Sequence, residues 1–262
     1  MNFKHFTVVT ALFILVFYGG LIASLGYFFD SKALWETFFS DRTLFSIRLS
    51  VVAATMAALL ALIIAVPAAY ALSRHFFPGR MIVDTILEFP LIVSPAALGA
   101  ILLIFFNNPL GEWIQRHLMA FVFVFPGIVL AQFITVLGIA TRLVKSTLDE
   151  IPPEYEQVAR SLGATPARAF MTITLPLAKR GLFAAFILSW AKAMGEFGAT
   201  IMVAGTMAMR TETLPVAIYM RLATADITGT VVLIVCLLFI GLGALYGVRL
   251  ISGKLGKYAE AP

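Results

Sequence analysis

Charged residues are scarce in this chain. Only 13% of its 262 residues are Asp, Glu, Lys or Arg, whereas 61% are hydrophobic and the mean hydropathy is +0.97. Soluble domains carry about 25% charged residues, so the composition excludes a water-soluble globular protein. The net charge of +5 comes from Lys and Arg residues that form no basic stripe interleaved with aromatic residues, which argues against nucleic-acid binding.

The residue types that metal and disulfide chemistry require are also few. Cys236 is the only cysteine and lies in an apolar run, so an intrachain disulfide and a cysteine-based metal site are excluded. The histidines His5, His75 and His117 fall in different predicted loops without H-E-x-x-H spacing. We therefore expect no shared metal site, and a membrane enzyme or scaffold is the less favoured alternative to a transporter.

A phosphate-binding loop is missing as well. The nearest pattern has five residues between Gly247 and Gly253 where the motif has four, and Leu255 follows Lys254 where the motif has Ser or Thr. We therefore expect no ATP site and no cofactor in this chain itself.

Long apolar runs dominate the sequence instead. About 20 apolar helical residues cross the roughly 30 Å of membrane hydrocarbon, and six runs are long enough: residues 8–29, 49–72, 82–106, 119–140, 182–205 and 230–250. The first run is longer than the core of a secretory signal, about 7–15 residues, and is expected to be retained. The sequence predicts an all-α membrane protein with six transmembrane helices in one domain over residues 1–262.

Lys and Arg are unevenly distributed among the predicted loops. One alternating set of segments carries more than twice as many as the other set. Positively charged short loops stay on the cytoplasmic side. Both termini and the connection at about residues 141–181 are therefore expected in the cytoplasm.

Small residues and prolines occur within the predicted spans. The alanine-rich run 53–71 is expected to pack closely against a neighbouring helix. Pro67, Pro90, Pro95 and Pro126 each remove a helical hydrogen bond, and each is expected to kink its span.

The connection at residues 141–181 has helical patterning. Between residues 147 and 162, apolar or small residues recur every three or four positions, which predicts an amphipathic helix interrupted early by Pro152 and Pro153. Gly163 is placed to end that helix in a left-handed conformation. Thr165 as N-cap and Pro166 as first helical residue predict a second short helix to about residue 170. This helix–glycine–helix knob is expected to project into the cytosol and to meet a partner.

The knob resembles the cytoplasmic loop of permease subunits from binding-protein-dependent ABC importers. The sequence signature of that family is E-A-A, three residues, G, nine residues and then I-x-L-P, and Gly163, Ile173, Leu175 and Pro176 match its spacing. The resemblance extends over about residues 48–249. It implies the type I importer permease fold, with a coupling-helix loop at about residues 141–181.

The first part of that signature differs in this chain. Gln157 stands in place of the glutamate and Val158 in place of the first alanine, while Ala159 matches the second and Glu156 offers a carboxylate one position upstream. The resemblance implies that the loop docks a separate ATPase subunit. The residues expected at this contact are Glu156, Gln157, Ala159, Gly163, Ala164, Thr165, Pro166, Ala169, Phe170, Ile173, Leu175 and Pro176.

Ionisable residues also lie inside the predicted spans. Glu88 is in the third span, and Lys192 and Glu196 are four residues apart in the fifth. An ionisable group at membrane depth costs at least about 2.5 kcal/mol unless it is paired or faces water. Lys192 and Glu196 can either form a self-contained salt bridge or line a translocation path. The candidate path residues are Lys192, Gly195, Glu196, Gly198 and Thr200.

Two stretches, residues 195–205 and 211–219, resemble the oxyanion branch of the family, which covers molybdate, tungstate and sulfate permeases. Within that branch the residues 198–200 and 214–219 are more similar to molybdate and tungstate permeases than to sulfate permeases. Residues 206–210 lack the Asn and Pro-Gly that many bacterial members carry. A sulfate or thiosulfate permease is the alternative.

The resemblance also implies an assembly. It implies a multi-pass protein of the prokaryotic plasma (inner) membrane that moves molybdate or tungstate inward. The implied partners are a second copy of the chain, two ABC ATPase subunits that hold ATP and magnesium, an extracytoplasmic oxyanion-binding protein and membrane lipid. A paralogous chain in place of the second copy is left open.

Overall fold

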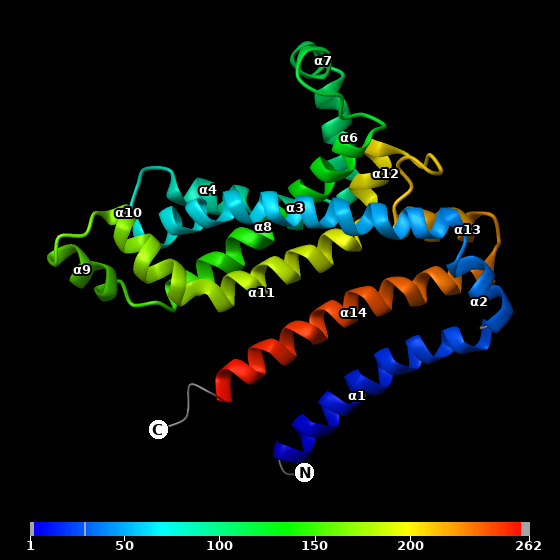
Figure 1. Cartoon of the computed structure of the whole chain (residues 1–262), viewed down its shortest axis with the longest axis horizontal. Helices are drawn as coiled ribbons and strands as arrows, with labels where there is room; N and C mark the ends of the chain where they lie inside the picture. Colours follow the sequence, from blue (N-terminus) through cyan, green and yellow to red (C-terminus); the bar gives the residue numbers. More distant parts are fainter. Residues whose placement is uncertain (1–2, 29, 258–262) are drawn as a thin grey trace.

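The computed structural model describes residues 3–28 and 30–257, and most of them lie in helices (Figure 1). Five helical segments are long and apolar enough to cross a membrane. They contain α1 (Phe3–Ser24, continued by the 3-10 turn Leu25–Phe28), α3 (Asp41–Arg74), α8 (Phe125–Asp149), α11 (Leu175–Met194) and α14 (Ile227–Lys257). The prediction of an all-helical membrane fold is confirmed.

Shorter helices connect these segments. They are α2 (Ser31–Phe38), α7 (Pro109–His117), α9 (Glu154–Ser161), α10 (Pro166–Ala169), α12 (Gly198–Ala204) and α13 (Leu214–Ala223). A π-helical turn, η2 (Phe170–Thr174), joins α10 to α11.

The third predicted span is a bent pair of helical segments. It consists of α4 (Arg80–Ile86), α5 (Phe89–Ile92) and α6 (Pro95–Phe106), with a bend of 110° between residues 80–92 and residues 95–106. Ser94 begins α6 because its hydroxyl accepts a hydrogen bond from the amide of Ala97 at 3.3 Å. The predicted number of six spans is reached when this pair counts as one span.

The prediction of one continuous fifth span over residues 182–205 is wrong. The helix α11 ends at Met194, and α12 begins at Gly198. Glu196 lies in the turn between them, where its carboxylate accepts a hydrogen bond from the amide of Ala199 at 3.1 Å and thereby satisfies the start of α12. The apolar run continues through this turn, so hydropathy alone hides the break.

The prolines begin helices more often than they kink them. Pro90, Pro95 and Pro126 lie in the first turns of α5, α6 and α8, where a missing amide proton is tolerated. Pro67 alone of these four lies inside a long helix, α3, which continues past it. The kink predicted at Pro95 is present as the 110° bend between residues 80–92 and 95–106, whereas Pro90 and Pro126 begin helices and do not kink a continuous one.

The core is a contact between α3 and the helices α8 and α11. Its α3 side is made of small residues, as predicted, and seven of them are completely buried: Ala53, Ala54, Ala57, Ala58, Ala61, Ala65 and Ala69. Against them lie Val136, Ala140 and Val144 of α8 and Ala185 of α11. Small side chains let helices in a membrane approach closely, so α3, α8 and α11 form the tightly packed part of the molecule.

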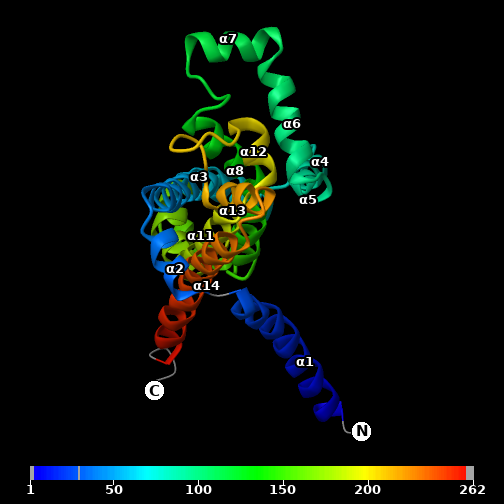
Figure 2. The ribbon, with the colours of Figure 1, turned by 90° about the vertical axis from the view of Figure 1, so that its right-hand side faces the viewer.

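The elements connected to this core lie at its two ends. In Figure 1, α9 and α10 lie at one end of α3, and α2 and α13 lie at the other. The helix α1 stands apart from the core in both views and has no buried residue (Figure 2). The helix α7 lies at the far end of α6 (Figure 2).

Candidate functional site

The segment between α8 and α11, residues 150–174, forms the predicted knob. Gly163 has a φ of +92° and ends α9, and the amide of Ala164 donates to the carbonyl of Ala159 at 3.1 Å. The hydroxyl of Thr165 accepts from the amide of Arg168 at 3.3 Å, directly before Pro166. The glycine turn, the N-cap and the proline start therefore lie where the sequence predicts them.

The second helix of the knob is not a separate short helix. It continues from α10 through the π-turn η2 into α11, so residues 166–194 form one unbroken helical segment. Ile173 and Leu175 are partly buried in this segment, and Pro176 is exposed. The knob is thus continuous with a spanning helix, and the connection between α8 and that helical segment is residues 150–165.

Glu156 points into the knob rather than away from it. Its carboxylate accepts hydrogen bonds from Tyr70 of α3 at 2.7 Å and from Thr174 at 2.6 Å, and it pairs with Arg74 of α3 at 3.4 Å. Only 8% of the residue is exposed. The carboxylate therefore holds the knob against α3 through contacts within the chain.

The electrostatic environment of Glu156 keeps it charged. Burial by itself raises the pKa of a carboxyl, but the hydrogen bonds from Thr174 and Tyr70 and the guanidinium of Arg74 outweigh burial. The pKa of Glu156 is consequently below its ordinary value. Arg74 also donates to the carbonyls of Leu148 and Ile151, at 2.9 and 2.7 Å, which satisfies backbone groups where α8 ends.

The outer face of α9 is apolar. Tyr155, Val158 and Leu162 are 54%, 61% and 84% exposed, and Gln157 is exposed beside them. Exposed apolar side chains that gather on a small projecting element mark an interaction surface. The pattern that predicts an amphipathic helix is therefore present, but its apolar side faces away from the bundle.

Four of the predicted contact residues support the knob from inside. Ala169 is completely buried, Ala159 and Ala164 are partly buried, and Phe170 packs against the ring of Tyr70 with 4.7 Å between ring centroids. Five predicted contact residues are exposed: Gln157, Gly163, Thr165, Pro166 and Pro176. Tyr155, Val158 and Leu162 are not among the residues predicted for docking.

The predicted path residues lie around the turn between α11 and α12. Lys192 and Glu196 form a salt bridge at 3.1 Å, in which the Lys192 side chain is 45% exposed and the Glu196 side chain is 1% exposed. Gly195 is exposed and Gly198 is partly buried. Thr200 is completely buried, and its hydroxyl has no hydrogen-bond partner among the described residues. Four of the five residues thus gather at one turn, whereas Thr200 lines no open surface here.

Two ion pairs escape the sequence analysis because their partners are far apart in the chain. Arg42 at the start of α3 binds Glu212 with two hydrogen bonds, at 2.7 and 2.6 Å. Arg142 of α8 pairs with Glu88, between α4 and α5. Each acidic residue stands next to an apolar run, and an isolated charge in such a position is the feature of the sequence that points to a partner.

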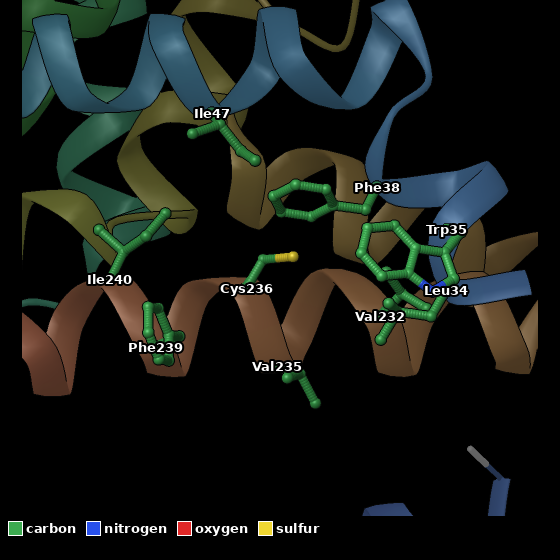
Figure 3. Close-up of a pocket in the computed structure, with 9 residues that line it drawn as sticks. All are labelled: Leu34, Trp35, Phe38, Ile47, Val232, Val235, Cys236, Phe239 and Ile240. Carbon is green, nitrogen blue, oxygen red and sulfur yellow. The ribbon is translucent and has the colours of Figure 1, made fainter. Parts of the chain in front are cut away.

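An apolar groove lies between α2, α3 and α14 (Figure 3). It has a volume of about 500 Å³ and is lined by aliphatic and aromatic side chains, among them Trp35, Phe38 and Phe239, together with Cys236. None of the described residues that line it is charged. This groove suits hydrocarbon and does not suit a polar ligand.

Comparison with known proteins places these features in a transport family. The model of a family described as binding-protein-dependent transport system inner membrane component matches residues 59–257. The sulfate transport system permease protein CysT of Escherichia coli is 28% identical over 225 residues, which cover 85% of this chain and 81% of that protein. The molybdenum transport system permease protein ModB of Haemophilus influenzae is 33% identical over 182 residues, which cover 68% of this chain and 80% of that protein.

A solved structure has the same fold. One chain of a bacterial alginate ABC transporter, crystallised in complex with an alginate pentasaccharide-bound periplasmic protein, superposes with a TM-score of 0.77 at 14% identity. The match covers 96% of this chain and 94% of that chain. The type I importer permease fold expected from the sequence is confirmed.

Proposed function

The chain belongs to the family of inner-membrane components of binding-protein-dependent transport systems and is a permease subunit of an ABC importer, and we propose that it imports a doubly charged tetrahedral oxyanion. The observation that carries this proposal is that relatives named for sulfate and for molybdenum transport match at 28% and 33% identity over most of their length. Sulfate, molybdate and tungstate share their charge and shape, so one path can serve this class of anion.

Within this class we propose molybdate and tungstate as the preferred substrates. This preference rests on the similarity of residues 198–200 and 214–219 to molybdate and tungstate permeases. Sulfate is the alternative, because sulfate permeases match equally well. Molybdate and tungstate are nearly equal in size, so the choice between them is assigned to the binding protein.

The knob is proposed to dock an ATPase subunit in the cytoplasm. The exposed Tyr155, Val158 and Leu162 provide the apolar contact, and the buried Glu156 fixes the angle of the knob to α3. ATP and magnesium belong to the ATPase subunits. In this orientation both termini are cytoplasmic, and two copies of the chain with two ATPase subunits form the importer, which receives its anion from an extracytoplasmic binding protein.

Uptake into reconstituted vesicles tests this proposal. The complex is reconstituted with ATPase subunits, and the cognate binding protein is loaded in turn with molybdate, tungstate and sulfate. Stimulated ATP hydrolysis and uptake with molybdate and tungstate support the proposal. Stimulation by sulfate alone overturns the substrate preference, and stimulation by none of the three overturns oxyanion transport.

A further inference from the structure

Two ion pairs lie within the spans, and the cation of each is partly exposed. Arg142 pairs with Glu88, with 51% and 39% of their side chains exposed, and Lys192 pairs with Glu196. Ionisable groups at membrane depth face a water-filled cavity or the bundle interior and mark ion and substrate pathways. The two cations are therefore candidates for contact with an anion on its way through the spans.

Close backbone contacts with the bent pair α4–α6 lie near both ion pairs. Gly138, one turn before Arg142 on α8, packs so closely that an added Cβ would lie 2.2 Å from the carbonyl oxygen of Leu87. At the start of α12, a Cβ on Gly198 would lie 2.9 Å from the amide nitrogen of Ala96. The two sides of the bend are thus pressed against α8 and α12, each beside one ion pair.

The cations lie at different depths. Gly181 of α11 is level with Thr147 of α8, because a Cβ on Gly181 would lie 2.2 Å from the Thr147 side chain. At 1.5 Å per helical residue, Arg142 lies about 8 Å and Lys192 about 17 Å from that level, away from the knob. An anion that travels toward the knob passes the depth of Lys192 first and that of Arg142 about 9 Å later.

A polar groove continues from Arg142 toward the end of α8. It has a volume of about 380 Å³ and is lined by Asp84, Arg142, Lys145, Ser146, Asp149 and Glu150. The α8 residues of this set are three or four positions apart and share one face of the helix. Apart from Arg142, the groove carries one cation and three carboxylates, and Lys145 is paired with Asp149 at 2.8 Å. An anion that leaves Arg142 therefore enters a region of negative charge.

We propose that Arg142 is an anion-binding residue at the knob end of the path and that Glu88 is its built-in competitor. This inference rests on the proposed oxyanion transport. A tetrahedral dianion presents two oxygens to a guanidinium as a carboxylate does, so it can take the place of Glu88. The return of Glu88 displaces the anion into the acidic groove. Conduction requires binding weak enough to permit release, and the competing carboxylate provides that weakness.

The test uses the complete complex, with ATPase subunits and binding protein, and compares the wild type with R142Q, E88Q and the double variant. In the first assay, uptake of molybdate, tungstate and sulfate into vesicles is measured. In the second assay, the complex is placed in nanodiscs, and inhibition of its ATP hydrolysis is measured as each free anion is added in excess over the binding protein. R116Q is the matched control, because Arg116 forms an exposed pair with Glu112 on α7, away from the bend.

The two single variants are expected to differ in opposite directions. R142Q should lose uptake by at least about tenfold and should not be inhibited by excess anion, because the cation is gone. E88Q should be inhibited at an anion concentration at least about tenfold lower than the wild type, because Arg142 has no competitor. The double variant should behave as R142Q does, and R116Q as the wild type.

If R142Q and E88Q had the same effect, the proposal would be overturned. An ion pair whose only role is to hold the α4–α5 segment to α8 is lost equally in both variants. Wild-type uptake by R142Q would overturn the proposal too. If R142Q does not assemble, R142K keeps a cation, and background uptake by an assembled R142K complex overturns the proposal. A wild-type complex that imports none of the anions defeats oxyanion transport itself, whereas wild-type uptake with an unaffected R142Q defeats only the role of Arg142.

Discussion

Each end of α3 is held by an arginine–glutamate ion pair, and the two pairs differ in their surroundings. At the knob end Arg74 pairs with Glu156, and both side chains are nearly buried, at 11% and 10% exposure. At the other end Arg42 pairs with Glu212, whose side chain is fully buried, while the Arg42 side chain is 51% exposed. The Arg74–Glu156 pair is thus buried on both sides, whereas the Arg42–Glu212 pair joins a half-exposed arginine to a buried carboxylate.

The number of partners distinguishes these two ends. Glu156 has three side-chain donors, and Arg74 also serves two backbone carbonyls. The hydrogen bonds found for the Glu212 carboxylate within the described residues all come from Arg42. Each partner removed from Glu156 should therefore lower stability by a part of the total, whereas removal of Arg42 should abolish the whole contribution of its pair in one step.

Removing Arg42 is expected to have the largest effect on stability. R42M leaves the Glu212 carboxylate buried without a partner, which should lower the free energy of unfolding by about 2–3 kcal/mol, less than for a fully buried pair because Arg42 is half exposed. Thermal unfolding of the purified chain in detergent measures this. R116M removes a cation from an exposed pair and should cost less than about 1 kcal/mol. Equal losses in the two variants would contradict the difference between the ends.

Glu156→Gln should have the second largest effect. Tyr70 and Thr174 can still donate to the amide oxygen, so the loss is that of a charged acceptor, about 1–2 kcal/mol. Because the folded-state pKa of Glu156 is lowered, its contribution is complete above the ordinary value of about 4.3 and is lost as the pH falls through the lowered pKa. The wild type and E156Q should therefore differ by a constant amount from pH 8 to about 5 and converge below about pH 4.

The exposed neighbour provides the control for that variant. Q157A should leave the unfolding free energy within about 0.5 kcal/mol of the wild type. Convergence of the wild type and E156Q between pH 8 and 6 would show that the carboxyl is not held ionised by its partners.

Tyr70→Phe should have a smaller effect than E156Q. The variant removes one donor and keeps the ring contact with Phe170, so Glu156 retains Thr174 and Arg74 and the cost is about 0.5–1 kcal/mol. In the E156Q background the same substitution should cost less, because the charged acceptor is already absent. A larger loss of unfolding free energy in Y70F than in E156Q would mean that Thr174 and Arg74 do not compensate for the missing Tyr70 donor.

Changes on the outer face of α9 should have the smallest effect on stability. V158S and L162S alter exposed side chains and should change the unfolding free energy by less than about 0.5 kcal/mol. Binding of the ATPase subunit should nevertheless weaken by at least about tenfold if these side chains are buried in the contact, since full burial of a Val or Leu side chain is worth about 1.5–3 kcal/mol. L118S, at an exposed leucine beyond α7, is the matched control. Undiminished binding by both knob variants would remove the docking role of this face.

Local chemistry made the knob predictable. Gly163, Thr165 and Pro166 lie within four positions, and each acts on its immediate backbone neighbours, so the turn and the helix start follow from residue type. The inward orientation of Glu156 was not predictable, because Tyr70 is 86 residues away in the sequence. Arg42 and Glu212 are separated by 170 residues.

The helix boundaries show the same division. Ser40 caps the start of α3 and Asp41 occupies its first turn, so a polar N-terminal extension of the apolar run was present in the sequence although the predicted span began at residue 49. At the break between α11 and α12, the Glu196 carboxylate accepts a hydrogen bond from the amide of Ala199, three residues later, inside an apolar run. Hydropathy registers that run and does not register the turn.

The length of α3 has a mechanical consequence. From Arg42 to Arg74 the helix spans about 48 Å at 1.5 Å per residue, whereas the hydrocarbon layer is about 30 Å thick. Its apolar stretch, residues 51–72, is about 33 Å long and matches that layer, so Arg74 lies about 3 Å and Arg42 about 14 Å beyond the ends of that stretch. A thinner bilayer must tilt such a helix or deform around it. The acyl-chain length of the host membrane therefore acts on both ends of α3 together, and through them on the two loops that they hold.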